Sequence, residues 1–252
     1  MSWSTAGRRC KPPVSGGAYN ESRAVKQLAL AMRLRTEAIF ESFSPGLNGE
    51  VLAALQTPQS APLWLWGAHG SGKTHLLQAV CAAAGGAAAY FPLDRRLNLP
   101  PEALAGFEHT AVLCLDDVEA VAGDLQWERA LFRLFNDAAD LRTRVVFAAG
   151  APPRQIDWSL DDWRSRAQAG VVYQLRELDD AGRVQALRLR AGQRGLQLPT
   201  EASDYLLKRM PRDLPSLFAI LDELDEASLV AQRRLTIPFI RAALEKHAGI
   251  KS

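Results

Sequence analysis

The segment LWLWGAHGSGKTHLL, residues 63–77, joins an apolar run, a glycine-rich turn and the start of a helical pattern. Residues 63–66 are all apolar, which is typical of a buried strand. Residues 67–74 fit the pattern GxxxxGKT of a phosphate-binding P-loop. Because this motif binds phosphate where a strand leads through the glycines into a helix, the segment predicts a nucleotide-binding site.

Each residue type in this loop has a chemical reason to be there. Glycines let successive backbone N–H groups turn toward phosphate oxygens, and the helix that follows adds its positive dipole end. Lys73 is predicted to reach the β- and γ-phosphates, and the Thr74 hydroxyl to bind Mg²⁺. The alternative is a tight turn that contains Lys-Thr by chance, which both flanking patterns disfavour. The predicted nucleotide-binding residues are Gly67, Gly70, Ser71, Gly72, Lys73, Thr74 and His75.

A second acidic motif, AVLCLDD, occupies residues 111–117. A buried strand that ends in two acids has the form of a Walker B strand, whose last residues lie beside the P-loop. Asp116 is predicted to hold the metal together with Thr74, and Asp117 is the candidate catalytic acid that polarises a water. Alone this string is a weak signal, but downstream of a P-loop the two motifs support each other.

Strand and helix patterns alternate over residues 63–175, which predicts an α/β domain with a doubly wound parallel sheet. Pro101 favours a short helix over residues 101–107. After residue 178 only helical patterns occur, which predicts a small all-α domain. The expected division is a disordered basic tail at 1–24, a short extended segment at 25–36, the α/β domain at 37–176 and the helical lid at 177–252.

Composition excludes several classes of protein. The chain of 252 residues has net charge +2, but residues 1–35 carry seven Lys or Arg and one acid, so the remainder is acidic. The basic tail could touch nucleic acid or simply be solvated, and the body is no basic, sequence-specific DNA-binding module. No apolar run is long enough to span a membrane, and the three cysteines are too scattered for disulfides or zinc. We therefore expect a cytoplasmic protein.

Several further strings resemble one family, the AAA+ protein Hda, the regulatory inactivator of the bacterial replication initiator DnaA. They are FPLDRR at 91–96, LCLDDVE at 113–119, PPRQ at 152–155, LLKR at 206–209, LDELD at 221–225 and AQRRLTIPF at 231–239. The resemblance runs from Gln27 to the C-terminal helix, and most of these strings are specific to the family. It implies an AAA+ nucleotide-binding domain followed by a lid, a bacterial protein of the nucleoid or replisome, and DnaA as partner.

The resemblance also gives the segment at 25–36 a function. Gln-Leu-x-Leu near the N-terminus of such proteins binds the sliding clamp, the β subunit of DNA polymerase III, and here the motif is Gln27, Leu28 and Leu30. An amide at the mouth of a pocket and two leucines in an apolar groove suit such docking. The alternative, which the alternating pattern alone supports equally, is a first edge strand of the chain's own sheet.

Two arginines correspond by position to functional residues of the family. Arg166 matches the arginine finger that AAA+ proteins present to a neighbour's nucleotide, although Arg164 lies only two residues away. Arg212 matches the second sensor arginine, which reaches a phosphate from the lid. Without the resemblance, each arginine reads as a member of a surface ion pair.

The chain departs from the family pattern after the strand at 144–149. Many relatives carry a polar first-sensor residue there, and this chain has Gly150-Ala151. Neither side chain can position a water or sense a γ-phosphate. The departure predicts weak or no intrinsic ATP hydrolysis and favours bound ADP over ATP, with Mg²⁺ as the metal.

The leading hypothesis is an adaptor that binds ADP or ATP, docks on the DNA-loaded clamp and stimulates ATP hydrolysis by DnaA, which prevents re-initiation of replication. A homo-oligomer is compatible with this hypothesis. The alternative is an autonomous P-loop ATPase such as a helicase loader, and a third hypothesis is a nucleotide-binding paralogue that stimulates nothing. An initiator would carry a helix-turn-helix domain after the lid, for which the sequence up to Ser252 leaves no room.

Overall fold

The structure, a computed structural model, describes residues 38–58, 61–93, 99–231 and 233–250. All of these residues belong to one compact unit of the chain. The predicted tail at 1–24 and the segment at 25–36, with Gln27, Leu28 and Leu30, lie outside the described residues. Within the described part, no helix combines the length and apolarity that a membrane crossing requires.

Among the described residues, five parallel strands form one sheet in the order β2-β3-β4-β1-β5. The strand at residues 63–66 pairs with two neighbours, so Leu63 lies opposite both Val146 and Val171. Strands that alternate with helices and do not pair in chain order are typical of a doubly wound sheet, and the predicted α/β class is confirmed. The strands are β1 (Leu63–Trp66), β2 (Ala88–Pro92), β3 (Val112–Asp116), β4 (Arg144–Ala149) and β5 (Val171–Gln174).

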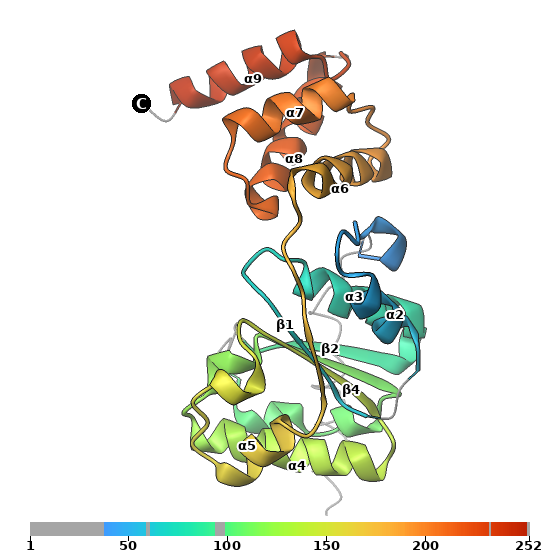
Figure 1. The fold of residues 1–252 in the computed structure, drawn as a ribbon, viewed down its shortest axis with the longest axis vertical. Helices are drawn as coiled ribbons and strands as arrows, with labels where there is room; N and C mark the ends of the chain where they lie inside the picture. The colour runs from blue at the N-terminus through green and yellow to red at the C-terminus, as the bar shows by residue number, and fades with distance from the viewer. Residues whose placement is uncertain (1–37, 59–60, 94–98, 232, 251–252) are drawn as a thin grey trace, which may run out of the picture. The chain divides into compact units, whose positions relative to one another are not determined.

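Helices cover both faces of this sheet (Figure 1). On one face lie α2 (Gly49–Gln56) and α3 (Lys73–Ala84), and on the other α4 (Leu125–Asp140) and α5 (Asp161–Ala167). Successive strand side chains point to opposite faces, so a sheet that is covered twice needs continuous apolar strands. This explains why the strand at 112–116 is buried at every position.

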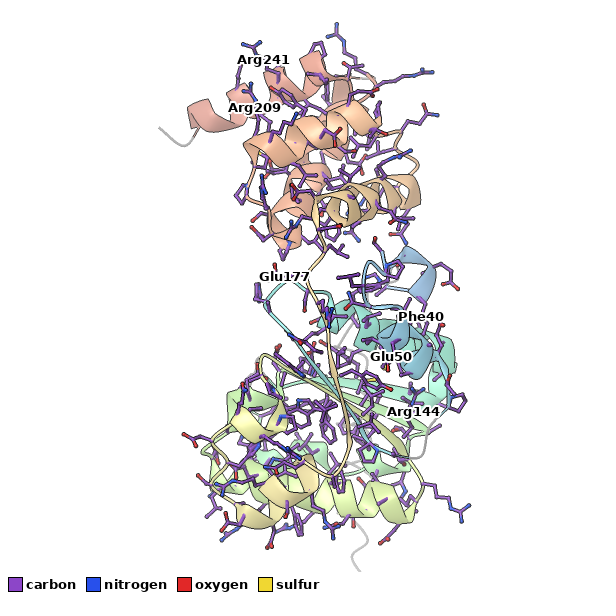
Figure 2. The ribbon with its side chains drawn as sticks, in the orientation of Figure 1. Phe40, Glu50, Arg144, Glu177, Arg209 and Arg241 are labelled. Atoms are coloured by element: carbon purple, nitrogen blue, oxygen red, sulfur yellow. The ribbon has the colours of Figure 1, made fainter. Side chains whose placement is uncertain are left out.

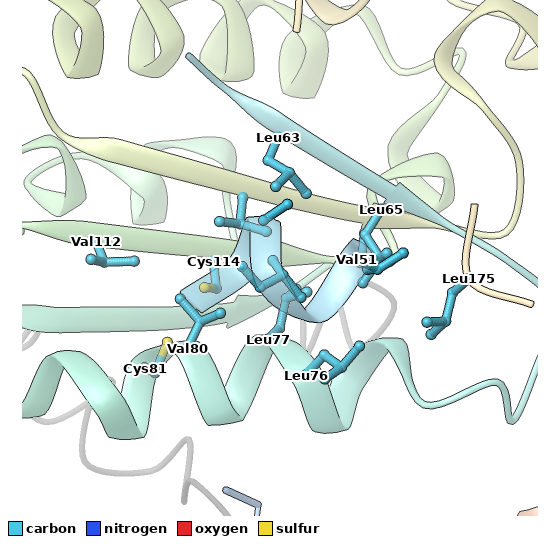
Figure 3. Packing of buried hydrophobic residues seen from close by; sticks show 14 residues of the cluster. Val51, Leu63, Leu65, Leu76, Leu77, Val80, Cys81, Val112, Cys114 and Leu175 are labelled. Atoms are coloured by element: carbon cyan, nitrogen blue, oxygen red, sulfur yellow. The ribbon is translucent and has the colours of Figure 1, made fainter. Parts of the chain in front are cut away.

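The core under α2 and α3 is aliphatic. Leu65, Leu76 and Leu77 are fully buried, and they pack against Val51 and Cys114 (Figure 3). Burying one such leucine contributes about 1.5–3 kcal/mol.

The core under α4 and α5 is aromatic. The Trp64 ring lies 5.2 Å from Phe147 and 6.3 Å from Trp158, and Trp163 lies 5.8 Å from Phe147 between ring centroids. Trp163 and Trp158 are both almost fully buried. The indole rings therefore fix α5 against the sheet, which matters because α5 carries the two arginines.

Short connections complete the α/β part. They include η1 (Phe40–Ser42), η2 (Gly85–Ala87), η5 (Val118–Val121) and η6 (Pro153–Gln155). The short helix predicted over 101–107 is wrong: η3 (Pro101–Leu104) and η4 (Phe107–His109) are separate 3₁₀ turns. Gly106 between them has φ +96°, a left-handed conformation that ends one turn and starts the next.

Arg144 connects a helix to the sheet. The guanidinium of Arg144, labelled in Figure 2, donates from Nη2 to the carbonyl oxygens of Leu55 at 2.7 Å and Ala54 at 3.3 Å. These carbonyls belong to the last turn of α2, which a cation stabilises. Arg144 thereby ties the end of α2 to the start of β4.

The C-terminal part is helical, as predicted. Its helices are α6 (Asp180–Gln193), α7 (Thr200–Arg209), α8 (Leu214–Ala231) and α9 (Ile237–Ile250). They share an apolar core of their own that includes Leu187, Leu206, Leu221, Leu224 and Ile240. Because the helical part and the α/β part have separate apolar cores, we propose a domain boundary at residue 176.

Candidate nucleotide-binding site

The glycine-rich loop runs from the end of β1 to Lys73 at the start of α3. Gly70 and Gly72 have φ of +77° and +101°, which non-glycine residues rarely adopt. A Cβ at Gly67 would lie 2.5 Å from the Leu175 carbonyl oxygen. The loop therefore needs all three glycines, each for conformation or for close approach.

Lys73 lies inside this loop and is 8% exposed. Its Nζ donates to the carbonyl oxygens of Gly67 at 2.9 Å and Ala68 at 3.1 Å, and no carboxylate among the described residues pairs with it. The Ser71 hydroxyl oxygen is also buried, without a described hydrogen-bond partner. A buried ammonium group held only by carbonyls carries uncompensated charge, and an anion such as phosphate would stabilise it.

The two predicted metal ligands lie together at the carboxyl edge of the sheet. Thr74 Oγ1 donates to Asp116 Oδ2 at 2.7 Å, and the Tyr90 hydroxyl donates to the same oxygen at 2.9 Å. Asp116 is 0% exposed, whereas Thr74 is exposed. Burial, with the nearby Asp116 charge, raises the pKa of Tyr90, so Tyr90 stays protonated and orients the carboxylate.

This pair of oxygens fits a hard cation. Mg²⁺ takes oxygen ligands and typically keeps several waters, with one or two protein groups and substrate phosphates completing its shell. The described residues contain no cluster of three or more His, Cys, Asp or Glu that would enclose a metal alone. Thr74 and Asp116 would thus hold Mg²⁺ only in company with a nucleotide phosphate.

Asp117 follows directly in an unusual conformation. Its φ of +52° lies in the left-handed region, and its N–H donates to Asp116 Oδ1 at 3.1 Å. The turn thus separates the two carboxylates: Asp116 stays in the strand, and Asp117 is the N-cap residue of η5. The predicted role of Asp117 toward a water stays a prediction.

The ring of His75 contacts the N-terminal turn. His75 Nε2 lies 3.0 Å from Ser42 Oγ and 3.1 Å from the Ile39 carbonyl oxygen. Phe43 packs 5.9 Å from the His75 ring centroid and lies close to Gly72. Residues 39–43 thus lie against the first turn of α3 through His75 and against the phosphate loop at Gly72.

Arg212 comes next to the same loop from the helical part. It lines a cavity of about 170 Å³ together with His69, Gly70 and Ser71. Its Nη1 lies 3.4 Å from Asp180 Oδ2, and 66% of its side chain is exposed. An exposed ion pair of this length is weak, so the guanidinium can exchange Asp180 for a phosphate.

The structure distinguishes the two arginines on α5. Arg164 Nη1 lies 2.7 Å from Asp161 Oδ1, and Arg164 Nη2 donates to the Trp158 carbonyl oxygen. Arg166 is exposed, and its side chain has no hydrogen bond or ion pair with another described residue. The two side chains point about 200° apart around the helix. Arg164 is therefore held within the chain, and Arg166 faces outward.

Sequence reasoning missed two glutamates of this region. Glu128 is 0% exposed on α4 and accepts the N–H groups of Gly123 at 2.7 Å, Ser159 at 3.1 Å and Leu160 at 2.7 Å. Leu160 is the N-cap residue of α5, so Glu128 fixes the start of the helix that carries Arg166. A charged residue on the apolar face of a helical pattern was the available signal. The second residue, Glu119, accepts the N–H of Gly150.

Comparisons with known proteins agree with this arrangement. Residues 180–244 match the family described as Hda, lid domain. The chain is similar to domain III of the replication initiation protein DnaA from Thermotoga maritima, with 22% identity, TM-score 0.72, and coverage of 85% of this chain and 98% of that one.

Two other solved structures share the fold. A DnaA bound to AMPPCP and single-stranded DNA has 24% identity and TM-score 0.63 over 79% of this chain and 69% of that one. The RuvB Holliday junction branch migration motor of Thermotoga maritima has 14% identity and TM-score 0.56 over 91% and 69%. These likenesses show the AAA+ fold. The chain thus has an AAA+ fold, and its helical part, over residues 180–244, is similar to the lid domain of Hda.

Proposed function

We propose that this protein is a nucleotide-bound regulator that stimulates ATP hydrolysis by DnaA and so limits the initiation of DNA replication. The observation that carries the proposal is the outward Arg166 beside the internally paired Arg164. The lid match to Hda supports DnaA as the partner.

The chain's own site would hold an adenine nucleotide. The glycines of the loop and Lys73 would bind the phosphates, and Arg212 would reach them from the lid. Thr74 and Asp116 would hold Mg²⁺, which neutralises phosphate charge when it is bound. We assign ADP as the resident nucleotide because position 150 supplies no polar first-sensor side chain.

Arg166 would act on the nucleotide of a neighbouring DnaA. Charge spreads over the equatorial oxygens of the transferring γ-phosphoryl group, and a guanidinium supplied across an interface stabilises that charge. A finger must reach beyond its own chain, so it has to be exposed and unengaged. Arg166 meets both conditions within the described residues, and Arg164 meets neither fully.

Docking on the sliding clamp would come from Gln27, Leu28 and Leu30. This part of the proposal rests on the sequence and the family resemblance, since these residues lie outside the described ones. Clamp binding would restrict the activity to DNA that has been replicated.

The test is single-turnover hydrolysis of ATP preloaded on DnaA, with clamp and DNA present. We expect this protein to accelerate phosphate release, and replacing Gln27, Leu28 and Leu30 by Ala to abolish the acceleration when the clamp is required. Acceleration that does not depend on the clamp would remove the clamp from the proposal. No acceleration, combined with rapid hydrolysis by this protein alone, would favour the autonomous ATPase.

A further inference from the structure

Position 150 is filled by a carboxylate from another element. Glu119 in η5 extends to the end of β4, where its Oε1 accepts the Gly150 N–H at 2.5 Å. β3 and β4 are neighbours in the sheet, so the segments that follow them meet at the same edge. The first-sensor position therefore has no side chain of its own, but the carboxylate of Glu119 lies beside it.

The missing side chain of Gly150, rather than its backbone angles, leaves room for this approach. A Cβ at position 150 would lie 2.9 Å from Glu119 Oε1. Any other residue there would push the carboxylate away or be pushed by it. The Glu119 carboxylate thus occupies the space where a first-sensor side chain would begin.

The same peptide group contacts the phosphate loop on its other side. The Ala149 carbonyl oxygen accepts the N–H of Gly67 at 3.2 Å, while the N–H of Gly150 is bound by Glu119. One peptide therefore lies between the first glycine of the loop and the carboxylate. This places Glu119 at the edge that holds Thr74 and Asp116, where the terminal phosphate of a nucleotide would project.

The second oxygen of Glu119 is unpaired. Oε2 is buried and has no hydrogen-bond partner among the described residues. An ionised carboxylate only accepts hydrogen bonds, and a partly dehydrated charge acts more strongly than one in water. Such a group repels a γ-phosphate, which also presents only acceptor oxygens, and has less effect on a diphosphate.

We propose that Glu119 replaces the first-sensor residue and sets the preference of this site for ADP over ATP. The inference rests on the proposed nucleotide binding, and it names the residue that reads the presence of the γ-phosphate. Glu119 is a specificity-determining residue in this account, and hydrolysis does not depend on it.

The test is titration of the full chain with ADP and with AMPPCP, each with Mg²⁺. Wild-type protein should bind ADP at least about tenfold more tightly than AMPPCP. Glu119→Gln removes the charge but keeps an oxygen for the Gly150 N–H, so AMPPCP affinity should rise about tenfold while ADP affinity changes less than about twofold.

Glu108→Gln is the matched control. Glu108 also accepts a backbone N–H, from Gly106 at 2.8 Å, but it precedes β3 and so lies toward the opposite edge of the sheet. Both affinities should stay at their wild-type values in this variant. If Glu119→Gln does not fold, Glu119→Ala also removes the charge and should reduce the preference for ADP.

The outcomes separate the inference from the proposed function. An unchanged ratio of ADP to AMPPCP affinity in the folded Glu119 variants would overturn the inference and leave nucleotide binding intact. If wild-type protein binds neither nucleotide, the proposed function fails, and the inference fails with it.

Discussion

The phosphate loop and the outer face of α5 differ in whether their cationic side chain is buried or exposed. Lys73 is buried and held by two carbonyl oxygens of its own loop, and Asp116 is held by two hydroxyl groups. Arg166 is exposed and has no partner among the described residues. Arg164, two residues earlier, is paired with Asp161 and with the Trp158 carbonyl oxygen. The first region is organised to receive a small anion, whereas the second leaves a cation available to something outside the chain.

The largest expected effect is at the outer face of α5. Arg166→Ala should lower the stimulated rate of ATP hydrolysis on DnaA about 10³-fold or more, because fingers supplied across an interface contribute on that order. ADP binding by the variant should be unchanged, since Arg166 makes no described contact to the phosphate loop. Single-turnover hydrolysis together with ADP titration checks both parts. A variant that stimulates as well as wild type would show that the finger assignment is wrong.

The second-largest effect is expected at the phosphate loop. Lys73→Ala removes the charge-assisted contacts to phosphate, so ADP affinity should fall about 100-fold or more by isothermal titration. Lys208→Ala, an exposed lysine on α7, is the control and should bind ADP as wild type does. Equal affinity in all three proteins would remove the phosphate-binding role of the loop.

Glu128 fixes the start of α5, the helix that carries Arg166, which predicts an effect on stability. Glu128→Ala leaves the N–H groups of Gly123, Ser159 and Leu160 without their acceptor, so the free energy of unfolding should fall by about 3 kcal/mol. Chemical denaturation measures this value. Glu128→Gln keeps one acceptor oxygen and should lose less, and a loss below about 1 kcal/mol in the alanine variant would contradict the role of Glu128.

The smallest effect is expected at Arg164. Its ion pair with Asp161 is partly exposed, at 44% and 88% of the two side chains, so it contributes little to stability. Arg164→Ala should therefore change DnaA stimulation by no more than a few-fold in the same hydrolysis assay. If Arg164→Ala abolishes stimulation and Arg166→Ala does not, Arg164 is the arginine finger.

The fold was predictable because its signals are local. The strands over 63–66 and 144–149 are continuous apolar runs, and the helix over 125–140 places Trp127, Leu131 and Leu134 on one face. A buried parallel sheet and an amphipathic helix impose these two patterns directly on the sequence. The glycines and Lys73 were likewise predictable, since the P-loop is one short segment.

The parts that were missed depend on contacts between distant residues. Glu119 meets Gly150 across 31 positions, and Glu128 meets Leu160 across 32. No pattern within one element reveals such a pairing. The choice of Arg166 over Arg164 came from the family resemblance and stays a prediction; the pairing of Arg164 with Asp161 and Trp158, which supports it, could not be read from the sequence. The split of 101–107 into two turns depended on the conformation of Gly106.

The most direct test of the account asks in which site ATP is cleaved. In one arm, DnaA carries ATP with a labelled γ-phosphate, and this protein carries unlabelled ADP on clamp-loaded DNA. In the other arm, this protein carries the labelled ATP, and DnaA carries unlabelled ATP. The account predicts rapid release of labelled phosphate in the first arm and slow release in the second. Rapid release only in the second arm would contradict it.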